Sequence, residues 1–169
     1  LTQLPNRLHC MALLKAKLQK QQNLACCFID LNGFKQINDT HGHHAGDKVL
    51  QIIAKKCHGH FNHKDIFARL GGDEFILVVN NFSCEDDLRI IVQRLITLIE
   101  EPMLLDQQTL QVGAAVGVAF HSPELNSVDK LFNAADTAMY QAKSHKSTLS
   151  NYCYFNQMDN TIDLTTTPA

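Results

Sequence analysis

The sequence lacks several features that mark particular classes of protein. No apolar run approaches the roughly eighteen residues needed to cross a bilayer, and the N-terminus lacks the basic, apolar and small-residue order of a signal peptide. Fifteen Lys plus Arg against seventeen Asp plus Glu give a formal charge of −2, without the clustered basic excess of a nucleic-acid binder. We therefore expect a soluble, cytoplasmic domain without a nucleic-acid partner.

The cysteines form no C-x-x-C pair, and several lie within apolar runs, where a small thiol packs well. This pattern favours reduced, buried cysteines of a cytosolic protein over a disulfide framework. The six residues concerned are Cys10, Cys26, Cys27, Cys57, Cys84 and Cys153.

Histidines gather in two short segments, which invites a zinc hypothesis. The later group has no accompanying ligand at the spacing of a structural zinc site, and its place near a predicted helix end suits polar side chains beside the last carbonyls. We therefore do not expect zinc. The groups are His41, His43 and His44, and His58, His60 and His63.

The chain, with 45% hydrophobic residues and no low-complexity tract, is long enough for one sizeable core and too short for two ordinary domains. Apolar periodicity and turn residues predict the order helix, strand, helix, hairpin, helix, strand, helix and a last short strand. The expected ranges are helix 5–21, strand 24–31, helix 44–60, strands 65–70 and 74–80, a helix capped by Ser83 with Asp86 and ending before Pro102, strand 109–120, a Ser127-capped helix to Lys143, and strand 152–155.

Two βαβ-like halves joined through a hairpin predict an α/β (α+β) fold. The central sheet would be of the ferredoxin-like or polymerase-palm type, with helices packed on it. A doubly wound Rossmann sheet is the alternative. No G-x-G-x-x-G follows the first strand, which favours the palm.

Three acids are placed to converge if the first strand and the hairpin are neighbours. Asp30 lies near the end of the strand LACCFIDL, and Asp73 and Glu74 lie at the hairpin tip after Gly71 and Gly72. Such carboxylates repel one another unless a cation lies among them, and hard oxygen ligands favour Mg²⁺, which prefers phosphates. The glycine N–H groups are natural phosphate ligands. A solvated turn without function is the alternative.

A loop or short helical turn is expected between the first strand and the helix at 44. The segment 34–47 alternates polar and small residues without an amphipathic period, which predicts a binding loop. Asn38 and Asp47 are able to offer hydrogen-bonding groups to a guanine edge. Both residue types are also good helix caps, and the residues alone do not decide between the two interpretations.

Five blocks of sequence, in this order, resemble the motifs of GGDEF domains, the nucleotide-cyclising modules of bacterial diguanylate cyclases. Any one block alone is a weak signal, but five in order at plausible spacing are specific. The resemblance implies a GGDEF domain over residues 1–155 and a tail or linker over 156–169. The blocks are LTQLPNR at 1–7, DLNGFKQINDTHGHHAGD at 30–47, RLGGDEF at 69–75, AVGVA at 115–119 and ADTAMYQAK at 135–143.

The resemblance implies that two facing domains join two GTP molecules into cyclic di-GMP and release pyrophosphate, with Mg²⁺ or Mn²⁺ as cofactor. It also assigns roles, in which Asp73 assists deprotonation of the attacking hydroxyl and Lys35 stabilises charge on the transferring phosphate. The implied residues are Asp73, Glu74 and Lys35 for catalysis; Asn38, Asp47, Phe34, His43, Gly71, Gly72 and Lys143 for substrate binding; and Asp30, the Leu31 carbonyl, Asp73 and Glu74 for the metal.

Three departures from the family pattern bear on activity. Asn32 replaces the second acid of D-x-D, which activity should tolerate because Asp30 carries the metal. Lys146, Ser147 and Thr148 stand where G-R-N is expected; without the planar fork of an arginine at Ser147, weaker triphosphate affinity is expected, with partial compensation by Lys146. The inhibitory R-x-x-D motif reads Asn62 to Asp65, so tight product feedback is not expected.

These departures leave three functions to weigh: an active cyclase, a weak or inactive GTP-binding module that regulates a neighbouring domain, and an unrelated palm-like protein. The opening inside the family's first motif predicts a parent protein with an N-terminal sensory part. A C-terminal phosphodiesterase domain and a membrane tether of that parent stay open. An isolated domain is expected to be monomeric and slow, because active members work as facing homodimers.

Overall fold

The computed structural model describes residues 1–20, 23–80, 82–144, 149–155 and 162–163. These residues form five helices and eight strands. The predicted elements occur in the predicted order, and one of the helices and three of the strands were not predicted. The helices are α1 (Arg7–Leu18), α2 (Phe34–His41), α3 (His43–His58), α4 (Glu85–Glu100) and α5 (Val128–Ser144). The strands are β1 (Leu24–Asn32), β2 (Ile66–Gly71), β3 (Glu74–Asn80), β4 (Met103–Leu105), β5 (Gln108–Leu110), β6 (Gly113–Phe120), β7 (Asn151–Tyr154) and β8 (Ile162–Asp163).

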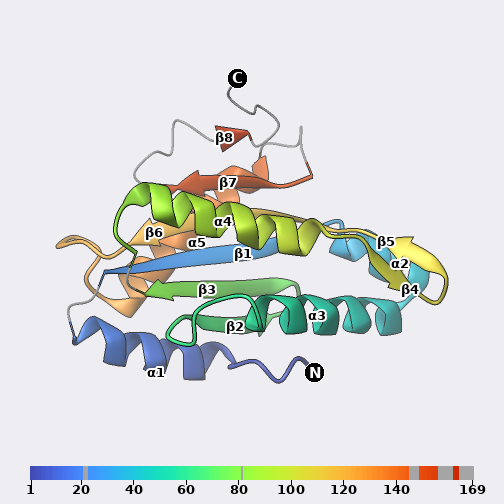
Figure 1. Cartoon of the computed structure of the whole chain (residues 1–169), viewed down its shortest axis with the longest axis horizontal. Helices are drawn as coiled ribbons and strands as arrows, with labels where there is room; N and C mark the ends of the chain where they lie inside the picture. The colour runs from blue at the N-terminus through green and yellow to red at the C-terminus, as the bar shows by residue number, and fades with distance from the viewer. Residues whose placement is uncertain (21–22, 81, 145–148, 156–161, 164–169) are drawn as a thin grey trace.

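The main sheet has the strand order β2-β3-β1-β6-β7-β8, so β1 lies near its centre (Figure 1). Strand β1 is antiparallel to both β3 and β6, whereas β6 and β7 run parallel with α5 between them in sequence. The palm-like α+β sheet predicted from the sequence is confirmed. Strand β8, at 162–163, lies within the segment expected to be a tail and pairs with β7.

Alternation along β1 explains why both faces of the sheet are covered. Successive side chains point to opposite faces of a strand. Ala25, Cys27 and Ile29 belong to a core with residues of α3 and α4, while Cys26 and Phe28 belong to a second core with residues of α1 and α5. Because both faces are buried, β1 reads as a continuous apolar run, and only Asp30 near its end interrupts it.

Of the loop or short helical turn expected before residue 44, the helical alternative is correct, and the binding loop predicted over 34–47 is instead α2 and the start of α3. Gly33 and Gly42 have positive φ values of 82° and 81°, which favour glycine and let the chain turn sharply before each helix. Phe34 and Ile37 of α2 are buried. Only these two of the eight residues of α2 are apolar, so their helical spacing was too short a pattern to identify the helix.

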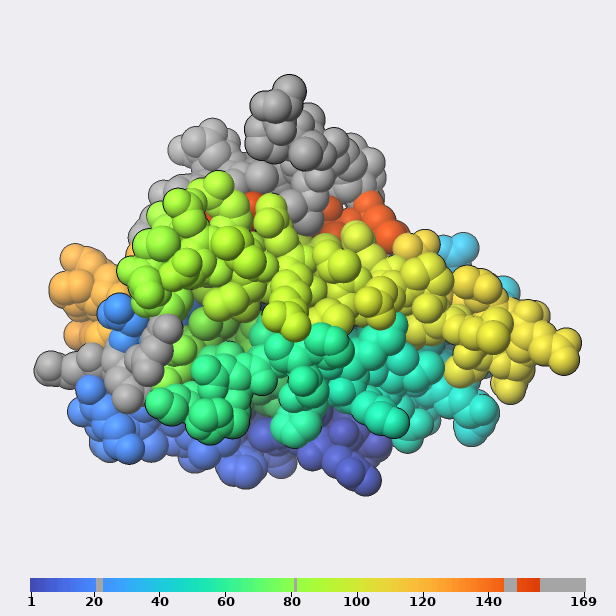
Figure 2. All heavy atoms as spheres, viewed as in Figure 1, coloured from blue at the N-terminus to red at the C-terminus, as the bar shows by residue number. Residues whose placement is uncertain are grey.

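The predicted strand 109–120 is two strands separated by a break, and the first of them belongs to a hairpin that the sequence did not reveal. Strands β4 and β5 pair through a two-residue turn at Asp106 and Gln107, whose φ values are 47° and 67°. Such turns usually have Asn, Asp or Gly at the first position and Gly at the second, and Gln107 in place of that glycine weakens the signal. The hairpin projects from one end of the molecule (Figure 2).

The predicted capping pair of Ser83 with Asp86 is also wrong. Cys84 is the N-cap of α4, without a side-chain cap, and the Ser83 amide donates to Oδ2 of Asp87 at 3.0 Å. Asp86 instead forms an ion pair with Arg89 at 2.7 Å. The helix end before Pro102 and the Ser127 cap of α5 are confirmed, the latter by a bond from the Lys130 amide to Ser127 Oγ.

No disulfide joins any of the six cysteines, as expected, and all are buried except Cys84. Burial raises the pKa of Cys10 to about 11 and that of Cys27 and Cys57 to about 12. Because the thiolate is the reactive form, these buried thiols act as small apolar side chains.

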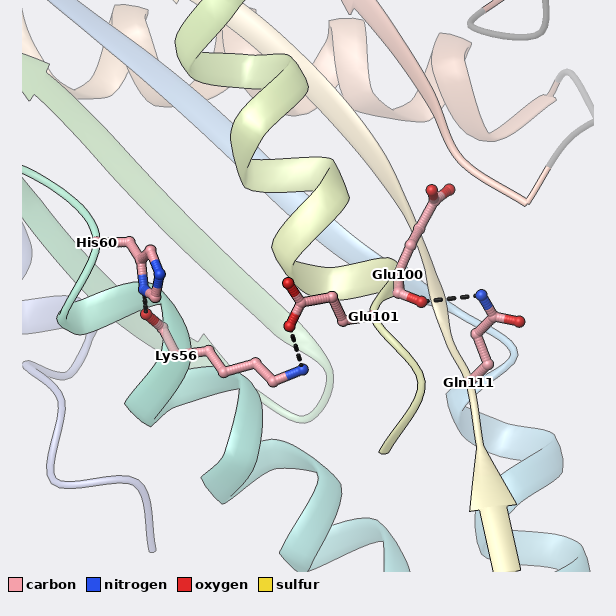
Figure 3. A network of polar contacts seen from close by, with 5 residues as sticks. All are labelled: Lys56, His60, Glu100, Glu101 and Gln111. Atoms are coloured by element: carbon pink, nitrogen blue, oxygen red, sulfur yellow. Dashed lines mark hydrogen bonds and ion pairs between the residues drawn. The ribbon is translucent and has the colours of Figure 1, made fainter. Parts of the chain in front are cut away.

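A polar network fastens the C-terminal ends of α3 and α4 to each other and to the segment before β6 (Figure 3). Lys56 pairs with Glu101 at 2.9 Å, which lowers the pKa of Glu101. The Lys56 carbonyl lies 2.6 Å from His60 Nδ1, and Gln111 donates to the Glu100 carbonyl at 2.8 Å. These bonds hold two helix ends in place on one face of the sheet.

No helix among the described residues has the length and hydropathy of a membrane span.

Candidate functional site at the junction of β1 and the hairpin

The end of β1 and the tip of the β2–β3 hairpin lie side by side. Asp30 is directly opposite Glu74 in the antiparallel register, and the Leu31 amide donates to the Asp73 carbonyl at 3.3 Å. Asp30 is only 7% exposed, whereas Asp73 and Glu74 are half-buried. The neighbourhood of the three acids that the sequence predicted is therefore present in the structure.

The turn between the strands is fixed rather than loose. Gly72 has a φ of 49°, a conformation that favours glycine. Its carbonyl accepts hydrogen bonds from Nε and Nη2 of Arg69 at 3.0 and 2.7 Å. The pairing shifts register between Arg69 and Gly71, which bends the end of β2. Arg69 of the RLGGDEF block therefore positions the turn, a role that the sequence pattern did not indicate.

The acids at the junction disfavour one another's charged forms. Burial raises the pKa of Asp30, the hydrogen bond and charge of Lys143 oppose this shift, and Asp73 adds to it. Burial likewise raises the pKa of Glu74, and the charges of Asp30, Asp136 and Asp73 raise it further. The three acids outnumber the one lysine that pairs with them, so the site carries an excess of negative charge, which an added cation would neutralise.

The donor set fits a hard divalent cation in its chemistry, because all the side chains concerned offer carboxylate oxygens. In the described part of the chain, however, no three His, Cys, Asp or Glu side chains are already arranged around a common metal position. The cation that contacts Asp30 in this structure is the ammonium of Lys143, whose Nζ is 2.8 Å from Asp30 Oδ1. The Lys143 ammonium thus supplies the positive charge next to the Asp30 carboxylate.

The first turn of α2 offers backbone N–H groups beside the junction. Gly33 is its N-cap and has no side chain to accept their hydrogen bonds. Phe34 is buried and fixes the start of the helix, while the Lys35 side chain is exposed. Free N–H groups at a helix N-terminus, with a lysine next to them, form a suitable site for phosphate.

The helix-cap interpretation of Asn38 and Asp47 is excluded, because the N-caps of α2 and α3 are glycines and both residues lie inside the helices. Asn38 packs directly over Gly46, where a Cβ atom would be 2.0 Å from Asn38 Oδ1. The glycine therefore makes room for the amide, and the next residue is the exposed Asp47. His43, also exposed, is the first residue of α3.

A cleft of about 590 Å³ is lined by residues of α2 and by Lys143. Asn38 and Asp47 do not line it, so the structure separates the proposed base-reading residues from this cleft. Asn32 lines the cleft, and its Nδ2 donates to the Leu149 carbonyl at 3.0 Å. Of the lining residues, Lys143 was predicted to bind substrate. The others were not predicted as site residues and include Asn32, Gly33, Gln36, Thr40 and Gln111. The predicted phosphate residues Lys146, Ser147 and Thr148 lie outside the described residues.

The segment in place of the inhibitory motif has a structural role. Asp65 accepts hydrogen bonds from the Asn80 amide at 2.8 Å and the Asn62 amide at 3.0 Å. Asn62 in turn accepts from the Lys64 amide. The Asp65 carboxylate therefore organises the loop before β2.

The sheet order, the covering helices and the fixed double-glycine hairpin define a palm-like α+β domain. A model of the family described as "Diguanylate cyclase, GGDEF domain" matches residues 1–148, and the chain belongs to this family. The match stops before the boundary at residue 155 that the sequence suggested, which stays a prediction.

Three relatives from Pseudomonas aeruginosa illustrate the similarity. The bifunctional diguanylate cyclase/cyclic di-GMP phosphodiesterase MucR is 32% identical over 164 residues, covering 95% of this chain and 24% of MucR. The crystal structure of the GGDEF domain of TpbB (YfiN) has a TM-score of 0.81 and 36% identity, covering 85% of this chain and 92% of that domain. The cyclic di-GMP phosphodiesterase NbdA is 35% identical over 123 residues, covering 73% of this chain and 16% of NbdA. The chain thus spans a quarter or less of the full-length relatives MucR and NbdA.

Proposed function

We propose that this domain is a diguanylate cyclase, which converts two GTP molecules into cyclic di-GMP and two pyrophosphates. The observation that carries the proposal is the pairing of Asp30 with Glu74 at the junction, beside the uncapped N-terminus of α2. Family membership supports it. The domain would act in the cytoplasm, where GTP is available.

In the proposed reaction, each 3′-hydroxyl attacks the α-phosphate of the other nucleotide. A 3′-O–P bond forms, the bond between the α- and β-phosphates breaks, and pyrophosphate leaves. Because each domain holds one GTP, two domains must face each other as a homodimer. Asp30, Glu74, Asp73 and the Leu31 carbonyl would hold Mg²⁺ or Mn²⁺, which when bound supplies positive charge to the phosphates and makes the hydroxyl easier to deprotonate.

The chain's own residues would bind and orient the nucleotide. The Asp47 carboxylate accepts from the guanine ring N–H and amino group, and Asn38 bonds the same edge through its amide. Backbone N–H groups at Phe34 and at Gly71 and Gly72 bind phosphate oxygens. The Lys35 ammonium stabilises charge on the transferring phosphate, and an Asp73 carboxylate oxygen accepts the proton of the 3′-hydroxyl.

The test is to incubate the purified chain with GTP and Mg²⁺ and to detect cyclic di-GMP by chromatography. A version fused to a dimeric coiled coil should be measured in parallel, because the isolated domain is expected to dimerise weakly. Asp73→Ala should abolish product in both. Absence of GTP binding would reject the proposal altogether.

The second candidate is a regulatory module that binds GTP without efficient turnover and controls an adjacent domain. It is favoured by Lys146, Ser147 and Thr148 in place of the family's G-R-N. MucR and NbdA, in which related sequence occurs beside phosphodiesterase function, are consistent with it. GTP binding without product in the dimeric version would select this candidate.

We predict that product will not inhibit this domain strongly. The inhibitory arginine is absent, and Asp65 is already bound to the Asn62 and Asn80 amides. Turnover measured with added cyclic di-GMP should stay nearly unchanged up to millimolar concentration. Inhibition at micromolar product would contradict this expectation.

We predict that Gly46→Ala will weaken GTP binding while the domain remains folded. The new methyl group would meet Asn38 Oδ1 at 2.0 Å and displace the half-exposed amide from its present position. Losing a hydrogen bond to the base should raise the Kd for GTP by about 10-fold, and alanine itself suits a helix. Isothermal titration against GTP, with Asn38→Ala for comparison, checks this. Wild-type affinity in both variants would show that Asn38 does not read the base.

A further inference from the structure

Lys143 connects two parts of the proposed site that are far apart in sequence. It lies in the last turn of α5, and its Nζ is 2.8 Å from Asp30 Oδ1 on β1. The two side chains differ in exposure, with 48% for Lys143 and 10% for Asp30. The carboxylate is therefore fixed and enclosed, while the ammonium reaches it from solvent on a flexible stem.

In the protein without ligands, the ion pair with Lys143 supplies the counter-ion of Asp30. An enclosed carboxylate requires a positive partner, and Asp30 also faces the charges of Glu74 and Asp73. Arg7 lowers the pKa of Glu74, but the only opposing charge found for Asp30 is Lys143. Among the described residues, Lys143 is thus the counter-ion of Asp30.

The same lysine also lines the 590 Å³ cleft next to Gly33, the N-cap of α2. A phosphate bound at that helix start would lie within the neighbourhood that Lys143 already occupies. A divalent cation at Asp30 would repel the ammonium, and a nucleotide phosphate would attract it. Although the two ligands have opposite charges, both therefore favour movement of the Lys143 ammonium away from Asp30 and towards the phosphates.

We propose that Lys143 exchanges partners between the Asp30 carboxylate and the phosphates of the nucleotide, so that without nucleotide it holds Asp30 and weakens divalent-cation binding there. This inference rests on the proposed function, because it assumes that Asp30 binds the metal and that nucleotide binds beside it. The consequence is positive coupling, in which each ligand removes an obstacle for the other and by linkage each raises the other's affinity equally.

The test measures two affinities separately, so that the nucleotide does not chelate the metal. Mn²⁺ binding is followed by electron paramagnetic resonance without nucleotide, and binding of a fluorescent GTP analogue is followed in EDTA. The variants are Lys143→Met, Lys143→Arg and Asp30→Asn. Lys56→Met is the matched control, because Lys56 also pairs with an acid, Glu101 at 2.9 Å, but at the ends of α3 and α4. Circular dichroism confirms folding of each variant.

The expected effects of Lys143→Met have opposite signs. Mn²⁺ should bind about 10-fold more tightly than to the wild type, and the metal-free nucleotide about 10-fold more weakly. Lys143→Arg, which keeps the charge, and Lys56→Met should leave Mn²⁺ affinity near that of the wild type. A purely structural role for Lys143 would weaken both affinities together, so the sign of the Mn²⁺ change decides.

The outcomes separate this inference from the proposed function. Mn²⁺ binding that is abolished by Asp30→Asn but unchanged or weaker in Lys143→Met overturns the partner exchange and leaves the cyclase proposal intact. No detectable Mn²⁺ binding to Lys143→Met overturns it as well. Mn²⁺ binding that survives Asp30→Asn removes Asp30 from the metal site and contradicts the proposed function itself.

Discussion

Glu74→Gln should lower the rate of cyclic di-GMP formation by about 10³-fold or more, in a preparation whose wild type is active. A metal-assisted phosphoryl transfer depends on charge that the metal supplies, which is worth several kcal/mol of barrier. The amide keeps the shape of the carboxylate but loses its charge and much of its affinity for a hard cation. Chromatographic measurement of product over time, at saturating GTP and Mg²⁺, gives kcat directly.

The same variant should unfold at an equal or higher temperature than the wild type when metal is absent. Burial and the charges of Asp30, Asp136 and Asp73 raise the pKa of Glu74 in the folded protein, so its ionised form disfavours folding. This penalty in the free energy of unfolding is absent below the usual pKa of a glutamate. It grows as the pH rises towards the raised pKa of Glu74 and is complete above that pKa. Replacing Glu74 by glutamine removes it at neutral pH.

Asp129→Asn serves as control, because Asp129 is an exposed acid at the start of α5, the helix whose last turn holds Lys143. It should keep the wild-type rate. If Glu74→Gln retained at least a tenth of that rate, the junction of β1 and the hairpin would not be the metal site. A large drop in unfolding temperature would instead show that Glu74 stabilises the fold, contrary to its raised pKa.

The parts of the fold that the sequence predicted are those whose signal is local. Strand β1 is a buried apolar run, the β2–β3 hairpin has two glycines at its turn, and α3 and α5 show helical periods. The missed elements lack such signals. Helix α2 is only eight residues long, and the turn of the β4–β5 hairpin has Gln107 in a left-handed conformation where glycine is usual.

The candidate site likewise has a part that local sequence patterns predict and a part that depends on tertiary packing. The adjacency of Asp30 and Glu74 was predictable, because a strand end and a hairpin tip follow from local pattern once the strands are taken as neighbours. The pairing of Lys143 with Asp30 joins residues 113 positions apart and depends on how α5 packs against the sheet. The bonds from Arg69 to Gly72 and the cleft beside α2 likewise depend on tertiary packing, which no local pattern records.

The close approach of α5 to β6 requires a glycine at position 117, which leads to the second large effect. Gly117 lies in β6, and a Cβ atom there would be 2.0 Å from both the Ala135 carbonyl oxygen and the Met139 amide nitrogen. Because these are backbone atoms of α5, no side-chain rotation relieves the clash, and the helix must move away from the strand. Gly117→Ala should lower the free energy of unfolding by roughly 3 kcal/mol or more.

Thermal unfolding followed by circular dichroism should show a fall of roughly 6–12 °C for Gly117→Ala, given a domain of this size. Gly59→Ala is the matched control, because its φ is −83° and a Cβ would meet nothing closer than the Lys55 carbonyl at 3.7 Å. That variant should unfold near the wild-type temperature. Since α5 also carries Lys143 towards Asp30, any Gly117→Ala protein that still folds should bind the GTP analogue less tightly, even where its secondary structure is retained. Wild-type stability in Gly117→Ala would mean that α5 does not pack against β6 as closely as the structure shows.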